Sequence, residues 1–254
     1  MTKYFLHLAY NGTKYRGWQR QLQVPTVQAA LEDTISKMLG YKITCKGCGR
    51  TDAGVHASQF FCHFRVEASF TYDPIFRLNK MLPSDIRVYD IVEVAKNAKA
   101  QLHVIERSYT YYIHGVENPF LPTMSSYYPI STLDMEKMVK ATALLKGVQD
   151  FRFFCKQPDL YDTTICKVST IEWKEPAQGR LELNITADRF LRGMIRIVVA
   201  NLLAVGYGEL TVSDIIKAIN LELALPIRTA AYPQGLYLSK VRYEYLDIAP
   251  NPIF

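Results

Sequence analysis

The feature that most constrains this chain is a short stretch of small and charged residues between two apolar, β-prone runs. It reads Gly-Arg-Thr-Asp-Ala-Gly-Val-His-Ala and covers residues 49–57. The flanking runs, 43–48 and 59–64, favour strands, so the stretch is expected to connect two strands tightly. Its glycines and alanines permit backbone conformations that larger residues exclude. The sequence therefore predicts that a turn presents Asp52 as a site residue. The alternative is an ordinary glycine-containing turn whose aspartate caps local amides.

Length and composition indicate one large domain or two closely packed halves. With 254 residues and 49% hydrophobic content, the chain can bury a sizeable core. No apolar run approaches the roughly 20 residues of a membrane-spanning helix, and residues 1–4 lead into a strand pattern rather than a signal peptide. We therefore expect a cytoplasmic protein with no membrane partner.

The cysteines argue against both a disulfide framework and a metal site. Five cysteines without a secretory signal are expected to be reduced thiols. Cys45 and Cys48 form a Cys-x-x-Cys pair, but their spacing from His56 and His63 does not match a zinc finger. In a strand, positions 45 and 48 would point to opposite faces. We expect no bound metal.

The charge balance favours a polyanionic partner. The chain carries 30 Lys and Arg against 24 Asp and Glu, for a net charge of +6. A loop after the first strand mixes basic and aromatic side chains, a combination that binds phosphates and stacks on bases. This basic aromatic loop contains Lys14, Tyr15, Arg16, Trp18 and Arg20. The alternative is a solvated turn with one half-buried tryptophan.

Hydrophobic periodicity and turn residues outline alternating strands and helices. Strands are expected at 5–10, 43–48, 59–64, 86–94, 109–114, 168–173, 181–186 and 235–245. Helices are expected from Thr26 to Gly40, from Asp73 to Leu82, from Ser131 or Thr132 to Gly147, from Phe190 to Val205, and after Ser213. Residues 118–129 contain three prolines and are the best candidate for a connection between halves.

One predicted helix carries a second candidate site. Arg192 and Arg196 lie four residues apart, so both are expected on one face of the 190–205 helix. Two stacked guanidinium groups would attract an anion.

Several motifs together resemble the TruA family of tRNA pseudouridine synthases. The most specific is the string at 49–56, which resembles the family's catalytic signature. The resemblance spans nearly the whole chain, with further motifs at 10–19, 79–88, 108–111, 190–196 and 235–238. It implies an α+β pseudouridine synthase fold in which two RNA-recognition-like, ferredoxin-like halves share an extended, mainly antiparallel sheet with a central cleft. The halves are expected at 1–107, carrying the Asp52 loop, and 108–254, carrying the Tyr109 strand and the Arg196 helix.

The resemblance also implies roles for individual residues. Asp52 is the catalytic carboxylate, Arg196 is its basic partner, and Tyr109 stacks on the target uracil. Arg50 lies against the RNA, with further contacts from the basic aromatic loop at Lys14, Arg16, Trp18 and Arg20. The alternatives are an Arg50 that is only a surface residue, a Tyr109 that belongs to the core, and an Arg196 that bridges a structural carboxylate.

The implied reaction needs few groups. Converting uridine to pseudouridine breaks the N1–C1′ bond and forms a C5–C1′ bond without changing composition. One catalytic carboxylate could therefore suffice, whereas a glycoside hydrolase needs two. Asp52, ionised beside an arginine, would be available as a nucleophile or a proton acceptor. Whether it attacks C1′, adds to the ring or leads to a glycal stays open.

The resemblance further implies tRNA as partner, uridines at positions 38 to 40 of the anticodon stem-loop as targets, a homodimer and no cofactor. The chain departs from the family pattern at Ala98–Gln101, Phe153 and Cys166, which concerns the RNA-contact surface. Two other functions stay open: a catalytically silent RNA-binding protein of the same fold, and a glycosidase that releases the base.

Overall fold

The chain forms two compact units in the computed structural model, which describes residues 1–225, 227 and 229–251. Unit 1 comprises Met1–Ile105 and Tyr237–Phe254, and unit 2 comprises Glu106–Leu236. The C-terminal segment thus belongs with the N-terminal unit, unlike in the expected division into 1–107 and 108–254. The reason is strand pairing, because the last strand lies parallel to a strand of unit 1 and places Tyr237 opposite His56.

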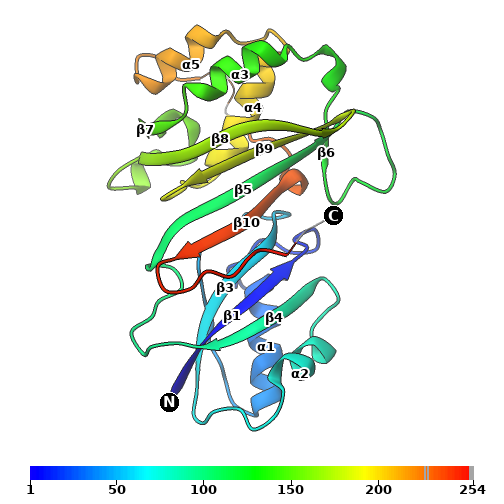
Figure 1. Ribbon diagram of the computed structural model, residues 1–254, viewed down its shortest axis with the longest axis vertical. Coiled ribbons are helices and arrows are strands. Elements are labelled where there is room, and N and C mark those ends of the chain that lie inside the picture. Colours follow the sequence, from blue (N-terminus) through cyan, green and yellow to red (C-terminus); the bar gives the residue numbers. More distant parts are fainter. Residues whose placement is uncertain (226, 228, 252–254) are drawn as a thin grey trace. The chain divides into compact units, whose positions relative to one another are not determined.

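Unit 1 is a sheet with two helices. Its strands are β1 (Thr2–Tyr10), β2 (Lys46–Gly47), β3 (His56–Val66), β4 (Ile86–Glu93) and β10 (Leu236–Tyr243), of which only Leu236 falls in unit 2. The strand order is β4-β1-β3-β10, with β2 on β3. The helices α1 (Val27–Leu39) and α2 (Pro74–Met81) lie on the same side of these strands (Figure 1). Buried aromatic and aliphatic residues of β1 and β3 form the core, including Phe5, Leu6, Leu8, Phe60, Phe61 and Phe64.

Unit 2 repeats the combination of antiparallel strands and helices. Its strands are β5 (Val104–His114), whose first two residues fall in unit 1, β6 (Ser126–Tyr127), β7 (Gly147–Asp150), β8 (Ile165–Ala177) and β9 (Arg180–Ala187). Their order is β5-β9-β8-β7, with β6 parallel to β5. Its helices are α3 (Met135–Ala143), α4 (Met194–Gly206) and α5 (Val212–Ile219), which lie together in Figure 1. The prediction of a mixed α+β fold with mainly antiparallel strands is confirmed.

The helices of unit 1 begin and end where local chemistry predicts. The Thr26 side chain accepts the Ala29 N–H at the start of α1, and Gly40 ends the helix with a left-handed φ of 79°. Asp73 caps α2, whose first residue is Pro74.

Three helices of unit 2 have predicted boundaries that are wrong. Asp134, not Ser131 or Thr132, caps α3, which ends at Ala143 rather than at Gly147. Thr211, not Ser213, caps α5, because Thr211 and Asp214 form a reciprocal capping box. The third error, at the start of α4, concerns the site and is described below.

Residues 118–129 do not connect the two units. They lie inside unit 2, and the chain passes between the units at Ile105/Glu106 and at Leu236/Tyr237. The segment returns to its starting strand, because Ser126 pairs with Ile113 and the Tyr128 N–H donates to the His114 carbonyl at 3.1 Å.

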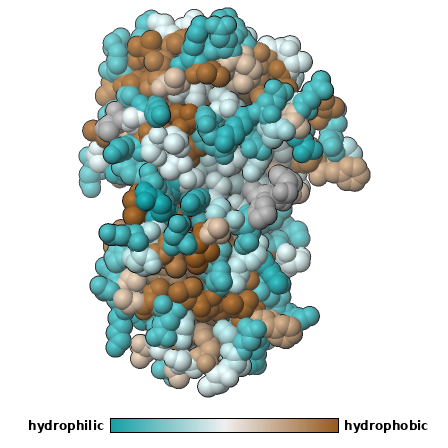
Figure 2. All heavy atoms as spheres, viewed as in Figure 1, coloured by the Kyte–Doolittle hydropathy of each residue, from teal (hydrophilic) through white to brown (hydrophobic). Residues whose placement is uncertain are grey.

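On the face shown in Figure 2, hydrophilic side chains are interspersed with hydrophobic patches. Across the described ranges, none of the helices combines the length and apolarity that crossing a membrane requires.

Candidate active site

Asp52 lies on a tight turn immediately before β3. The Val55 N–H donates to the Asp52 carbonyl at 3.2 Å, and Gly54 adopts a φ of 75°. This agrees with the expected turn between strands, although β2 is shorter than the predicted 43–48 strand and β3 begins earlier, at His56.

The loop after β1 holds this turn in place on both sides of Asp52. The Trp18 N–H donates to the Thr51 carbonyl at 3.2 Å, and the hydroxyls of Tyr10 and Thr51 are 2.8 Å apart. On the other side, the Gly54 N–H donates to the Tyr15 carbonyl at 3.2 Å. The position of the Asp52 backbone is therefore set by a segment that precedes α1 and is distant from Asp52 in sequence.

Two glycines make this close approach possible. A Cβ on Gly12 would collide with the Val55 carbonyl, and a Cβ on Gly17 would collide with the Thr51 carbonyl. Gly17 also has a φ of 90°, which side chains other than glycine rarely tolerate. The glycines of the basic aromatic loop thus serve the Asp52 turn.

The aromatic residues of that loop lie in the core. Trp18 is only 2% exposed, and its ring centroid is 4.1 Å from that of Phe60. Tyr15 is also buried and donates its phenol proton to Asp85 at 2.5 Å, and burial is the main cause of its raised pKa. Neither ring is presented for stacking on RNA, so we leave Trp18 out of the RNA contacts proposed below.

The basic side chains near the turn differ in how far their charge is compensated. Arg20 is paired with Glu32 at 2.8 Å and Asp33 at 2.5 Å, and Lys14 lies 3.7 Å from Asp85. Arg16 and Arg50 are exposed, and neither forms an ion pair with any residue that the structure describes. The pairing of Arg20 was not expected from the loop sequence, because its acidic partners lie on α1, outside the loop that contains Arg20.

In unit 2, Tyr109 lies on β5 opposite Ile185 of β9. It is 8% exposed, and its ring meets that of Phe190 edge to face, with centroids 5.1 Å apart at 80°. On the opposite face of the sheet, Thr110 donates a hydrogen bond to Asn184 at 2.8 Å. Phe190 thus restrains the orientation of the Tyr109 ring.

Arg196 lies in the first turn of α4 and is held by a distant loop. Its Nε donates to the Ala231 carbonyl at 2.6 Å, and the Ala231 N–H donates to the Arg196 carbonyl at 2.9 Å. Its positive charge also acts on the Tyr111 phenol, whose pKa is raised mainly by burial and lowered in part by Arg196. Ala231 is far from Arg196 in sequence, and no sequence pattern links the two.

Arg192 and Arg196 do not share a helix face, which corrects the sequence prediction. The chain turns at Gly193, with a φ of 71°, and α4 begins only at Met194. Arg192 therefore precedes the helix, and its guanidinium donates to Gln157 at 2.9 Å.

Three of the six residues that depart from the family pattern are buried, and Lys99 and Gln101 are exposed. Ala98 and Ala100 are buried, and the Ala100 N–H donates to His63 Nδ1 at 3.1 Å. Cys166 is fully buried on β8, which raises the pKa of its thiol to about 12. Phe153 lies half-buried in a short 3-10 turn.

Cys45 and Cys48 are both buried, and only Lys46 and Gly47 between them are in a strand. The condition for their pointing to opposite faces, a strand over 43–48, is therefore not met. In the described part of the chain, no three His, Cys, Asp or Glu side chains are grouped as metal ligands would be.

Comparison with known proteins gives a consistent result. A family model described as tRNA pseudouridine synthase matches residues 141–244. A relative from Azobacteroides pseudotrichonymphae is 36% identical over 255 residues, covering 100% of this chain and 99% of the relative. Relatives from Porphyromonas gingivalis and Bacteroides fragilis are each 38% identical, covering 96% and 95% of this chain and 98% and 96% of their own. All three are named tRNA pseudouridine synthase A. With the Asp52 signature folded into a tight turn and full-length similarity to these relatives, the chain belongs to the tRNA pseudouridine synthase A family.

Proposed function

We propose that this chain isomerises uridine to pseudouridine in tRNA, at positions 38 to 40 of the anticodon stem-loop. The observation that carries the proposal is the signature at 49–56, whose aspartate lies on a turn locked by the glycine-containing loop before α1. Full-length relatives named for this activity support the reaction, and the resemblance supplies the expected target positions.

We assign the chemistry to Asp52 and Arg196. The Asp52 carboxylate acts as the nucleophile or accepts a proton while the C1′–N1 bond breaks, and the detached uracil is retained until C5 attacks C1′. Water must be excluded, because water would trap the sugar and release the base. Arg196 serves as the basic partner of Asp52, and its hydrogen bond to Ala231 orients the guanidinium for this role.

The remaining site residues bind the RNA. A uridine within a stem must leave the base stack to react, and an aromatic platform stabilises a flipped base by about 1–3 kcal/mol. We assign the platform to Tyr109 on the family resemblance; its ring is only 8% exposed and packs on Phe190, so stacking on uracil requires the base to take the place of that contact. Arg50 and Arg16, both exposed, are assigned to the phosphates or to the gap that the flipped base leaves, with Lys14 and Arg20 contributing less because acidic residues pair with them.

We also propose that the protein acts in the cytoplasm as a homodimer with tRNA lying across both subunits. A folded tRNA extends well beyond the arm being modified, and two-fold pairing is the commonest way for identical chains to enlarge a surface. The loop after β5 supports this assembly, because Phe120 is 85% exposed and Tyr127 is 40% exposed.

The test is nucleotide analysis of an unmodified tRNA transcript after incubation with the protein. We expect chromatography of the digested tRNA to show pseudouridine replacing uridine at positions 38 to 40, with no free uracil. Bound tRNA that stays unmodified would instead support a silent RNA-binding protein. Free uracil in the reaction would identify a base-releasing glycosidase.

A further inference from the structure

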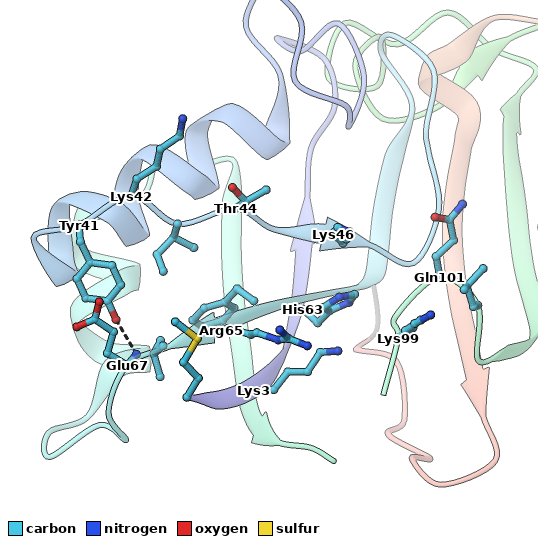
Figure 3. Close-up of a pocket in the computed structure, with 15 residues that line it drawn as sticks. Lys3, Tyr41, Lys42, Thr44, Lys46, His63, Arg65, Glu67, Lys99 and Gln101 are labelled. Carbon is cyan, nitrogen blue, oxygen red and sulfur yellow. Dashed lines mark hydrogen bonds between the residues drawn. The ribbon is translucent and has the colours of Figure 1, made fainter. Parts of the chain in front are cut away.

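A basic cavity of about 660 Å³ lies in unit 1, away from the Asp52 turn. Its walls come from the start of β1, the segment after α1, the end of β3 and residues 99–102 (Figure 3). Five of its lining residues form what we call the basic groove: Lys3, Lys46, His63, Arg65 and Lys99. Figure 3 shows these side chains near one another, whereas Lys42 points away from them.

Strand register brings basic side chains face to face in this groove. Lys3 is directly opposite Arg65 across β1 and β3, which pairs two positive charges, and Lys46 is directly opposite His63 across β2 and β3. Positions 63 and 65 share one face of β3, so all four side chains lie on the same face of the sheet. Like charges directly opposite one another destabilise a strand pair. The Lys3–Arg65 pair therefore carries an electrostatic cost, which the Lys96 and Ala98 carbonyls offset in part by accepting hydrogen bonds from the Lys3 ammonium and which a bound anion would reduce further.

No carboxylate among the described residues forms an ion pair with Lys3, Lys46, Arg65 or Lys99. Lys46, Arg65 and Lys99 are exposed, so their charges are accessible to a ligand.

The two less exposed groups of the groove respond to this concentration of charge. Burial, followed by Arg65, Lys99 and Lys46, lowers the pKa of Lys3. Burial and the four cations lower the pKa of His63 to about 4. His63 is therefore neutral at pH 7, and because Nδ1 accepts the Ala100 N–H, its proton is on Nε2, which is a further donor.

The groove and the Asp52 turn lie at opposite ends of β3. From His56, next to the turn, to Arg65 the strand advances nine residues, or about 30 Å at roughly 3.3 Å per residue. Both ends belong to unit 1. The groove is thus too far from Asp52 to contact the nucleotide that reacts there.

We propose that the basic groove binds phosphate groups of the tRNA backbone at a distance from the target uridine, the full length of β3 away from Asp52. The proposal rests on the proposed function for the identity of the RNA. Cations from four chain segments suit a run of phosphates, and contacts of this kind position an RNA without reading its sequence. The groove would align the body of the tRNA while the Asp52 turn engages the anticodon arm.

A triple variant tests this proposal: Lys46→Ala, Arg65→Ala and Lys99→Ala in one chain. Removing mutually repelling cations is not expected to unfold the protein. The matched control combines Lys37→Ala, Lys80→Ala and Arg87→Ala, which remove the same charge from exposed positions of unit 1 outside the groove. The dissociation constants for full-length tRNA and for the isolated anticodon stem-loop are measured over a range of salt concentrations.

For full-length tRNA, we expect the groove variant to reduce the slope of log affinity against log salt by about 2, since each lost phosphate contact contributes roughly 0.7–0.9. Its affinity should fall at least about tenfold, and that of the control much less. Both variants should bind the isolated stem-loop equally. Equal losses of tRNA affinity in the two variants would overturn the proposal.

A second measurement uses the unmodified chain and a ¹³C-labelled histidine titration, with His63→Gln to assign the signal. Saturating tRNA should raise the pKa of His63 above about 4, because phosphates offset the surrounding cations. An unchanged pKa would overturn the proposal, as would an equal shift with millimolar inorganic phosphate, which would indicate a small-anion site.

The unmodified chain is assayed for pseudouridine in parallel. Groove-dependent binding without pseudouridine would refute only the proposed function, and pseudouridine formation without groove-dependent binding would refute only the groove.

Discussion

Asp52 is the residue on which the proposed chemistry depends most directly. Asp52→Asn should preserve the fold and most of the tRNA affinity, because the amide has the same shape and the turn is held by backbone contacts. Turnover should fall by about 100-fold or more, because the amide cannot act as the anion. Pseudouridine formation under single-turnover conditions is the measurement, and activity within tenfold of the unmodified chain would remove Asp52 from the mechanism.

Comparing Gly17 with Gly40 separates the steric effect of the close contact in the basic aromatic loop from the cost of a left-handed backbone. Both have a left-handed φ, 90° and 79°, but only at Gly17 would a Cβ meet backbone, that of Thr51. Gly40→Ala should lower the free energy of unfolding by about 1–2 kcal/mol, the cost of the backbone conformation alone. Gly17→Ala should cost clearly more and should also reduce turnover by displacing Asp52. The free energies of unfolding are measured with denaturant. An equal decrease in the two variants would show that the close contact with the Thr51 carbonyl contributes nothing to the cost.

At the scale of elements, the start of α5 shows why capping residues must be identified from structure. Thr211→Ala removes the side chain that accepts the Asp214 N–H, and should destabilise the protein by about 1 kcal/mol, a few degrees in melting temperature. Ser213→Ala is the matched control, since Ser213 lies inside the helix, where alanine is favourable. Calorimetry distinguishes the two, and a larger loss for Ser213→Ala would contradict the observed cap.

The end of β3 gives the protein a pH-dependent stability. The usual pKa of histidine is near 6.5, and that of His63 is lowered to about 4 by burial and by Lys3, Lys46, Arg65 and Lys99. Between these values the unfolded chain binds a proton that the folded chain does not, so stability falls as the pH drops from about 6.5 to about 4. His63→Gln should remove this contribution. Urea unfolding at several pH values should show the unmodified chain losing stability more steeply on acidification; parallel curves would contradict the assignment.

At the scale of the whole molecule, the proposed dimer can be tested at Phe120, which is exposed in the segment after β5. Burying a phenylalanine side chain contributes about 1.5–3 kcal/mol, so Phe120→Ser should weaken dimerisation at least about tenfold. Affinity for tRNA should fall in parallel if the RNA spans both subunits. Leu22→Ser, at a position 93% exposed in unit 1, is the control. A monomer by sedimentation that still converts uridine at the full rate would end the dimer proposal.

The sequence alone determined those properties that depend on a few neighbouring residues. Thr26 and Gly40 bound a helix because capping and left-handed termination are local, and the 49–57 stretch forms a turn because small residues permit it. The family was also recognisable, since its signature is a contiguous string around Asp52.

Only the tertiary structure decided how distant segments meet. Trp18 lies in the core because Phe60 packs on it, and Arg20 is neutralised by acids on α1; neither partner is adjacent in sequence. The β10 strand returns to unit 1 because it pairs with β3, although most of the chain separates the two strands. The basic groove has the same origin, since register places Lys3 opposite Arg65 although the two are far apart in sequence. Periodicity reports which face a residue occupies, whereas long-range pairing decides what faces it, and at both the Asp52 turn and the groove that pairing determines the chemistry.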